Sequence, residues 1–268
     1  MLDFIAPPVS LRPPVKFPVL LFKIFLAPVL IALISLAGRK WGPGVSGWLL
    51  GIPFNSGPIL FFLSLEQGPQ FASHTALGSL LGILAWVAFN LVYSYCCLKM
   101  RWWQSTIIGW IAYFAVAALL LPAKLGLVWS FLVVTVSLAL VLWVFPRVQS
   151  VSAAGYGKYD LVLRMVTACG MVLSLTSFAR WLGPMASGLL SAFPAYTTIL
   201  AVFTHRQSAA AAVTVLKGVT AGLYTAAVFF LILSPALLHL HIAAAFGLAI
   251  AGGLVVQAAS LFYVRRNA

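Results

Sequence analysis

The sequence predicts an all-α polytopic membrane protein with about nine transmembrane helices in two inverted-topology repeats. Composition is the first observation behind this fold class: 63% of the residues are hydrophobic, 7% are charged, and the mean hydropathy is +1.09. Soluble domains carry roughly 25% charged residues, so this composition is typical of a chain embedded in lipid. The other two observations are a series of long apolar stretches and an internal repeat.

The apolar stretches are about as long as the ~20 residues that a helix needs to cross a bilayer core. We expect helices near 19–37, 47–65, 71–95, 104–121, 126–145, 160–179, 187–204, 210–233 and 243–263. The segment 235–242 either lengthens the ninth helix or forms a surface turn. The first 18 residues, which contain five prolines, are expected to form an extended tail on the membrane surface.

The internal repeat supports a duplicated unit. The stretch GPGVSGWLLGIPF, which begins at Gly42, recurs 141 positions later as GPMASGLLSAFPA from Gly183. Further pairs under this offset, or under 140 after a one-residue deletion, are Lys23 with Arg164, Arg39 with Arg180, Gly78 with Gly218 and Gly82 with Gly222. A repeat that spans most of the chain determines the architecture of the protein.

The number of helices between the copies predicts their relative orientation. Five crossings separate the first helix of each copy, and an odd number inverts the second. We therefore divide the chain into a tail (1–18), a first repeat (19–125), a connecting helix and loop (126–157) and a second repeat (158–268). Inverted repeats are a recurrent basis of secondary transporters, in which the substrate lies near the bilayer midplane.

Proline interruptions in the second and seventh predicted helices indicate where a substrate would bind. Proline removes an intrahelical hydrogen bond, and the freed backbone groups cannot face lipid. Paired interruptions in two halves point to a transporter's binding site, whereas the alternative is that these residues only allow close helix packing. The predicted substrate-binding residues are Pro53, Asn55, Ser56, Pro194, Tyr196, Thr197 and Thr198.

A few charged residues are candidates for coupling or gating. Glu66 ends the second predicted helix, and His205 and Arg206 stand at the equivalent place in the second copy. They form either a proton-responsive pair or ordinary interfacial caps, and inversion places them on opposite faces. Lys23 and Arg164 lie about one turn into the first and sixth helices, where each either extends to the headgroups or attracts anionic substrates.

The distribution of charge indicates orientation and partners. The formal net charge is +13. Dispersed basic residues favour anionic lipids as partners and argue against nucleic acid. Because cytoplasmic loops are enriched in Lys and Arg, the carboxyl terminus is expected in the cytoplasm. The side that carries the excess includes Arg39, Lys40, Lys99, Arg101, Arg147, Lys158, Arg206, Arg265 and Arg266.

The sequence contains no constellation that predicts an enzyme. It lacks a phosphate-binding glycine loop, a serine elbow, paired carboxylates and a metal-binding histidine pair. We therefore expect no catalytic residue, no metal and no cofactor. An intramembrane transferase that uses Glu66 or His74 is the remaining enzymatic alternative.

The second half resembles the GlpM family of small bacterial inner-membrane proteins, which look like a single copy of this unit. The marks are SGLLSAFPAYTTILAVFTHRQSAAAAV, with Ser187, Gly188, Leu189, Phe193 and Pro194, and the turn at 205–208. The resemblance implies a multi-pass protein of the bacterial inner (plasma) membrane and a link to glycerol phosphate metabolism or envelope polysaccharide. It supplies neither a substrate nor catalytic residues.

Together these features predict a secondary transporter for a small or amphiphilic solute, with an anion preferred because 16 basic residues face three acidic ones. One alternative is a scaffold for envelope polysaccharide or lipid synthesis, and another is a flippase for lipid or polyprenyl phosphate. A transporter should have a water-accessible cavity at the interruptions. A scaffold should have apolar side chains that fill this space, and a flippase should have a basic groove that opens to lipid. Small-residue patterns leave a homodimer open.

Overall fold

The structure is a computed structural model that describes residues 17–54, 56–149, 159–179 and 184–267, and every regular element in these ranges is a helix. This confirms the all-helical class. The elements are α1 (Phe17–Trp41), α2 (Pro43–Leu49), α3 (Ser56–Glu66), α4 (Pro69–Cys96), α5 (Trp102–Leu120), α6 (Leu127–Val144), α7 (Asp160–Ala179), α8 (Pro184–Ser191), α9 (Ala195–His205), α10 (Ala209–His239) and α11 (Ile242–Asn267).

Six helical stretches in the described ranges are long and apolar enough to cross a membrane: α4, α5, α6, Met185–His205, α10 and Ile242–Leu261. They indicate a multi-pass membrane protein. The predicted span 47–65 is not among them, because it is divided into α2 and α3, of 7 and 11 residues, by a longer break than the one between α8 and α9 within Met185–His205. The predicted spans 19–37 and 160–179 correspond to α1 and α7, which have 25 and 20 residues.

Both proline-containing helices are interrupted where the sequence predicted. Residues 50–54 are not helical in the first, and residues 192–194 are not helical in the second. Pro235, in contrast, lies within α10, which continues to His239. Residues 235–239 therefore extend the eighth predicted helix, residues 240 and 241 form the turn, and Ile242 begins α11. A membrane helix tolerates a single proline when its freed carbonyl is satisfied nearby.

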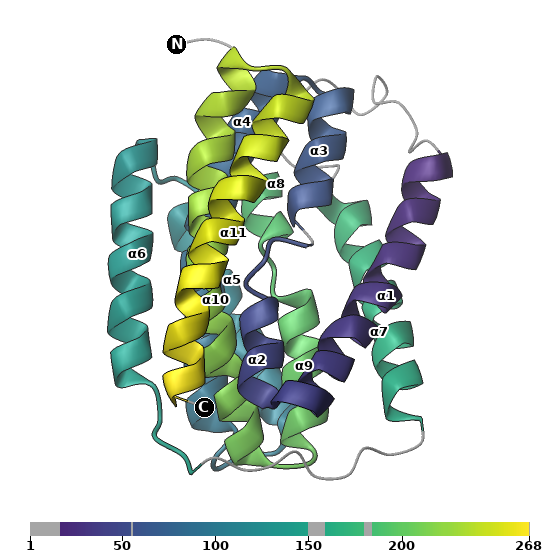
Figure 1. Cartoon of the computed structure of the whole chain (residues 1–268), viewed down its shortest axis with the longest axis vertical. Coiled ribbons are helices and arrows are strands. Elements are labelled where there is room, and N and C mark those ends of the chain that lie inside the picture. The colour runs from purple at the N-terminus through teal and green to yellow at the C-terminus, as the bar shows by residue number, and fades with distance from the viewer. Residues whose placement is uncertain (1–16, 55, 150–158, 180–183, 268) are drawn as a thin grey trace.

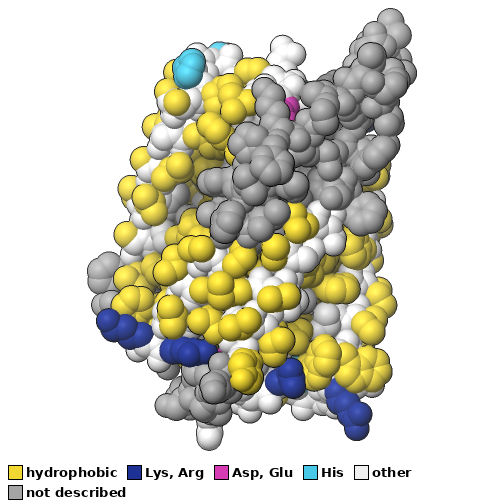
Figure 2. All heavy atoms as spheres, turned by 90° about the vertical axis from the view of Figure 1, so that its right-hand side faces the viewer, with side chains coloured by type: hydrophobic (Ala, Val, Ile, Leu, Met, Phe, Trp, Pro, Cys, Tyr) yellow, Lys and Arg dark blue, Asp and Glu magenta, His cyan; other side chains and the backbone are white. Residues whose placement is uncertain are grey.

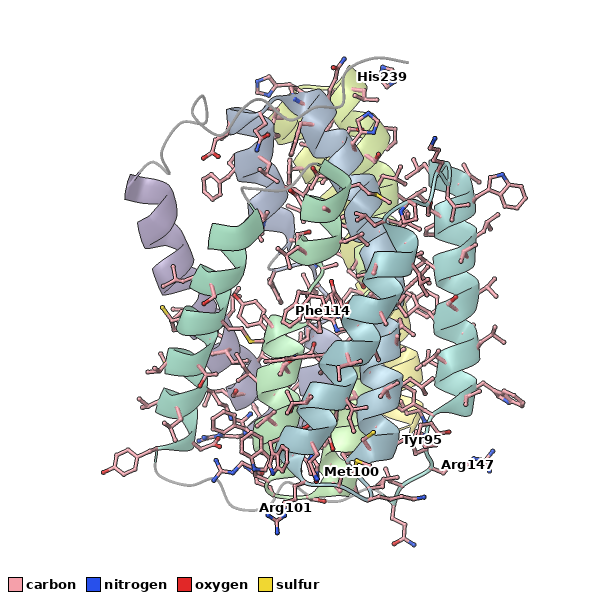
Figure 3. All side chains as sticks on the ribbon, turned by 180° about the vertical axis from the view of Figure 1, so that it is seen from behind. Tyr95, Met100, Arg101, Phe114, Arg147 and His239 are labelled. Carbon is pink, nitrogen blue, oxygen red and sulfur yellow. The ribbon has the colours of Figure 1, made fainter. Side chains whose placement is uncertain are left out.

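The two longest helices, α4 and α10, form the centre of the bundle, and α5, α6 and α11 are mostly exposed on the outside (Figure 1). The chain passes from α4 to α5 at the end where Met100 and Arg101 lie, and from α10 to α11 at the opposite end, where His239 lies (Figure 3). Consequently α4 and α10 run in opposite directions, as do α5 and α11. A hydrogen bond from the amide of Asn90 to the hydroxyl of Thr220, 3.1 Å long, joins the central pair.

Charge is divided between the two ends of the bundle. On the face shown in Figure 2, Lys and Arg gather at one end, while histidine and one acidic side chain appear at the other. Arg101 and Arg147 mark the first end, which we call the basic end, and His239 marks the opposite end (Figure 3). This arrangement agrees with part of the uneven charge that the sequence predicted, because the side chains of Lys158, Arg265 and Arg266 lie outside the described structure.

Glycines allow α2 to pack against α10, and α8 against α4, almost in backbone contact. A Cβ atom on Gly47 would lie 2.0 Å from the carbonyl oxygen of Val215 in α10. Gly188 is the counterpart of Gly47 under the 141-residue offset, and its Cβ would lie 2.3 Å from the carbonyl oxygen of Thr75 in α4. Thr75 is in turn the counterpart of Val215 under the 140-residue offset that applies from α4 onward. Each short helix therefore packs on the long helix of the other half.

The next glycine pair repeats this exchange. A Cβ on Gly218 would lie 2.2 Å from the carbonyl oxygen of Gly44, and a Cβ on Gly78 would lie 2.7 Å from that of Met185. Under the same two offsets, Gly78 corresponds to Gly218 and Gly44 to Met185. The contacts between the halves are therefore reciprocal.

Candidate functional site

The two interruptions have matching backbone hydrogen bonds. In the first, Phe54 N donates to Ile52 O at 2.7 Å, and in the second Ala195 N donates to Phe193 O at 2.8 Å. Further pairs related by 141 residues are Gly57 N to Pro53 O and Thr198 N to Pro194 O, both 2.8 Å. The prolines thus produce the same local turn twice, and a new helix, α3 or α9, begins directly after each turn.

The two interruptions meet at one small central cavity. Its volume is about 20 Å³, which is little more than one water molecule requires. Pro53, Ser56 and Tyr196 are the predicted site residues that line it; the other lining residues are Leu50, Ile52, Phe54, Trp86, Ser191, Phe193 and Ala195. The structure therefore brings the two interruptions together, but the space between them is filled mainly by apolar side chains.

Hydroxyl groups connect the interruptions to each other and to α4. The hydroxyl of Ser56 donates to the carbonyl oxygen of Ser191 at 2.8 Å, and the hydroxyls of Ser191 and Ser79 lie 2.8 Å apart. The indole Nε1 of Trp86 is buried and has no hydrogen-bond partner within the described ranges. Because an unpaired buried donor is unfavourable, this N–H group could donate a hydrogen bond to an acceptor atom of a ligand in the cavity.

Three further predicted binding residues, Pro194, Thr197 and Thr198, are buried but do not line the cavity. The Thr198 hydroxyl donates to the carbonyl oxygen of Pro194 at 2.7 Å and accepts from Trp110 Nε1 at 3.2 Å. Thr197 is 0% exposed, and its hydroxyl has no partner among the residues that the structure describes. Asn55 lies outside the described residues. A binding role for these residues remains a prediction.

The candidate coupling residues Glu66 and His205 lie at opposite ends of the bundle, at the ends of α3 and α9 (Figure 1). They therefore do not form a pair in this structure. Glu66 and Arg206 are exposed. The half-buried His205 has its Nδ1 at 3.2 Å from the hydroxyl of Tyr93. The backbone of Lys23 lies in α1, but its side chain is outside the described part of the structure.

Arg164 is buried and paired rather than extended toward headgroups. Its side chain is 1% exposed, and its Nε donates to Oδ2 of Asp160 at 2.9 Å. Arg39 from the end of α1 lies 3.7 Å from the same oxygen, and the guanidinium carbon of Arg164 lies 5.0 Å from the ring centroid of Phe203 in α9. This ion cluster ties α1, α7 and α9 together, which neither interpretation of Arg164 from the sequence anticipated.

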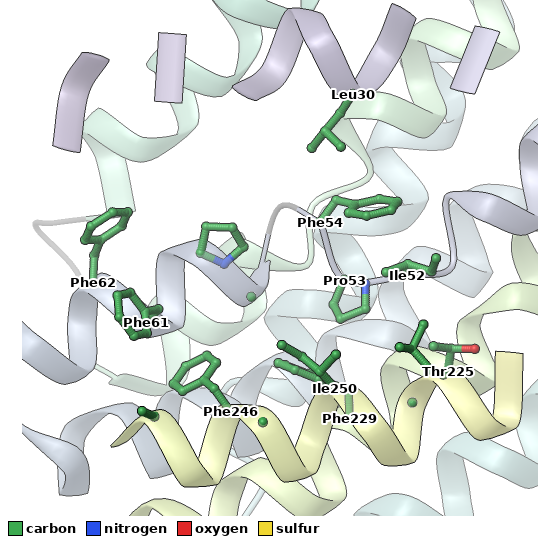
Figure 4. Close-up of a pocket in the computed structure, with 16 residues that line it drawn as sticks. Leu30, Ile52, Pro53, Phe54, Phe61, Phe62, Thr225, Phe229, Phe246 and Ile250 are labelled. Carbon is green, nitrogen blue, oxygen red and sulfur yellow. The ribbon is translucent and has the colours of Figure 1, made fainter. Parts of the chain in front are cut away.

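A much larger cavity, of about 770 Å³, lies beside the first interruption (Figure 4). Thr225 is the one residue with a polar side chain among the sixteen that line it, and its hydroxyl is hydrogen-bonded to the side-chain oxygen of Gln257. Ile250 and Leu254 of α11 are 51% and 53% exposed and form part of its rim. The cavity is therefore apolar and opens on an exposed apolar surface of α11. Other lining residues include Leu30, Pro53, Phe61, Phe229, Phe246 and Gly247.

Aromatic residues fill the equivalent space in the second half. Phe193 of the second interruption contacts Tyr113 and Phe114 of α5, with ring centroids 5.1 and 5.6 Å apart. Trp110 lies 5.9 Å from the same ring. Their counterparts around the large cavity are smaller: Ile52 for Phe193, Ile250 for Trp110, Gly253 for Tyr113 and Leu254 for Phe114. The cavity exists beside one interruption because these smaller residues leave the space open.

Sequence reasoning missed Trp86 and Ser191 at the central cavity, Ser79 beside Ser191, and most of the lining of the large cavity. Ser191 stands within the repeated motif and could have been found there. Trp86 lies inside a continuous apolar stretch and carries no local signal, because its position at the cavity depends on how α4 packs.

Comparisons with protein-family models, curated proteins and solved structures found no match to this chain. The resemblance to the GlpM family, based on Ser187 to Pro194 and the following turn, therefore remains a prediction.

Proposed function

We propose that this chain is a membrane transporter that moves an amphiphilic anion, a molecule with an apolar chain and a negatively charged group, across the bilayer. The large cavity beside Pro53 carries the proposal. It holds the apolar chain, and the charged group reaches the interruptions. This combines the amphiphilic solute and the lipid-like substrate that the sequence left as alternatives.

The size and chemistry of the cavity support an apolar ligand. Its volume of about 770 Å³ falls within the range of roughly 300–1,000 Å³ found for small-molecule sites. The phenylalanines and the exposed rim at Ile250 and Leu254 allow an acyl or prenyl chain to enter from the membrane without passing through water. A small hydrophilic solute would gain no binding free energy from contact with these apolar side chains.

Helix termini and charge support an anionic group. Helices α3 and α9 both begin at the interruptions, and helix amino termini carry partial positive charge that favours anions. The chain also has 16 basic and three acidic residues. The substrate-binding roles proposed for Pro53, Ser56 and Tyr196 rest on their place around the central cavity.

We also propose that the two halves are inverted copies and that the basic end faces the cytoplasm. The reciprocal glycine contacts and the opposite directions of α4 and α10 support inversion, and the excess of Lys and Arg supports the orientation. Lys99 lies between α4 and α5, at the basic end, and Lys124 lies between α5 and α6, at the opposite end. In a cysteine-free background, Lys124→Cys should react with a membrane-impermeant thiol reagent on intact cells, and Lys99→Cys should not. The reverse pattern of labelling would contradict the orientation.

A scaffold for envelope synthesis is the second candidate. The apolar filling around the 20 Å³ central cavity favours it, because a scaffold needs no continuous path. The two functions differ in whether the large cavity must stay open.

Filling the large cavity tests the proposal. Gly247 lines it, and a Cβ there would have nothing within 4 Å, so Gly247→Leu should occupy the space without displacing neighbours. We expect photocrosslinking of a diazirine-bearing fatty acid to residues of α3 and α11 to fall about ten-fold. Ile250→Trp, which copies Trp110 of the second half, should act similarly. Labelled peptides identified by mass spectrometry report the site.

Gly170→Leu is the matched control, because Gly170 of α7 also has open space around its Cβ and does not line this cavity. Its crosslinking should equal that of the wild type. Equal labelling of the Gly247→Leu and wild-type proteins would refute binding in the cavity.

A further inference from the structure

A second cavity, of about 490 Å³, lies between α6, α10 and α11, apart from both interruptions. Two basic side chains line it: Arg147, in the segment that follows α6, and Lys217 of α10. The remaining lining residues are Ala139, Leu142, Trp143, Phe145, Ala221, Tyr224 and Ser260. The cavity therefore combines two cations with hydroxyl groups and an apolar wall.

Neither cation has an ion-pair partner among the described residues. Within the described ranges, ion pairs of Asp160 involve Arg39 and Arg164, and neither Arg147 nor Lys217 forms one. Glu66 lies at the far end of the bundle, at the end of α3. Lys217 is half-buried about two turns into α10, where an unpaired ammonium group is unfavourable unless an anion accompanies it.

The cavity lies near the basic end of the bundle. Arg147 lies at the basic end of the bundle (Figure 3). Trp143, near the end of α6, is 84% exposed and lines the cavity, and exposed tryptophans near helix ends mark the membrane interface. A ligand here can hold its charged group against Lys217 and its apolar part against Leu142 and Trp143.

We infer that this cavity binds a phosphate-bearing anion and that Lys217 and Arg147 contact its phosphate group. Arg and Lys both form charge-assisted hydrogen bonds with phosphate, and basic pockets between transmembrane helices bind anionic lipid headgroups. The volume and the apolar wall favour the headgroup of an anionic phospholipid. The site is separate from the cavity beside Pro53 and does not depend on the function proposed for that cavity.

Lipid binding to the full-length, delipidated protein in detergent tests this inference by native mass spectrometry. The wild type should bind phosphatidylglycerol more tightly than zwitterionic phosphatidylcholine. Lys217→Gln and Arg147→Gln should each weaken phosphatidylglycerol binding about ten-fold, the loss expected for one charge-assisted hydrogen bond. Lys217→Arg should retain binding. Lys99→Gln, which removes an exposed charge away from the cavity, is the control and should leave affinity unchanged.

A competition arm identifies the source of the phosphate group. Displacement of phosphatidylglycerol by inorganic phosphate, lost in the Arg147→Gln variant, would support the site and show that it also accepts free phosphate. No displacement, with the lipid preference intact, would support a site for the headgroup alone. The inference is overturned if the affinities of the Arg147→Gln, Lys217→Gln and Lys99→Gln variants for phosphatidylglycerol are the same. Because Arg147 is exposed on a connecting segment, its variant remains informative even where Lys217→Gln fails to fold.

Discussion

Gly47→Ala and Gly188→Ala should each destabilise the protein by about 3 kcal/mol, the upper part of the range for overpacked cores. The added methyl group would lie 2.0 or 2.3 Å from a backbone carbonyl oxygen of α10 or α4, so a whole helix must move. Unfolding in mixed micelles of dodecyl maltoside and SDS measures the change in free energy. Similar losses in the two variants would reflect the reciprocal packing of the halves.

Gly170→Ala is the control, because its expected change in stability has the opposite sign. Its Cβ meets no neighbour within 4 Å, and alanine favours a helix over glycine by roughly 0.5–1 kcal/mol. It should therefore leave the stability unchanged or raise it. If Gly47→Ala behaved like Gly170→Ala, the close contact between α2 and α10 would be wrong.

Asp160→Asn should destabilise the protein by about 3–5 kcal/mol, because it removes the carboxylate that pairs with the buried guanidinium of Arg164. The expected size follows from the 1% exposure of Arg164 and the 2.9 Å contact of its Nε with Asp160. Glu66→Gln makes the same chemical change at an exposed site and should alter stability by less than about 0.5 kcal/mol. The same unfolding assay applies to both variants.

A double variant separates loss of the ion pair from general damage. Replacing both partners of a buried pair by apolar or neutral groups is often nearly neutral. Asp160→Asn combined with Arg164→Met should therefore recover much of the stability lost in Asp160→Asn. If the two changes simply added, the ion pair would not be the source of the effect.

The interruptions could be predicted from sequence because their cause is local. Pro53 and Pro194 each lack a backbone donor, and the matching hydrogen bonds around them depend on nearby residues. The ion pair in α7 was also within reach, since Asp160 and Arg164 are four residues apart and adjacent on one helix face. In contrast, Glu66 and His205 stand at equivalent places in the repeat but lie at opposite ends, because α3 and α9 end at opposite ends of the bundle.

The large cavity could not be predicted because it depends on which helices meet. Gly253 and Leu254 differ visibly from Tyr113 and Phe114 in the sequence. The difference gains meaning only when α11 is known to lie beside the first interruption, as α5 lies beside the second. Likewise, Arg147 and Lys217 are 70 positions apart and converge through the packing of α6 against α10. Long-range packing determines all of these features.

Transbilayer movement of an amphiphilic anion tests the central claim most directly. Proteoliposomes containing the wild type and fluorescent NBD-phosphatidylglycerol should lose the signal of both leaflets when dithionite is added, because inner-leaflet lipid is carried outward. The Gly247→Leu protein should leave the inner-leaflet signal protected, and Gly170→Leu should behave as the wild type. The account would be contradicted if the inner-leaflet signal in wild-type vesicles were protected to the same extent as in protein-free vesicles. It would also be contradicted if the Gly247→Leu protein moved lipid as fast as the wild type.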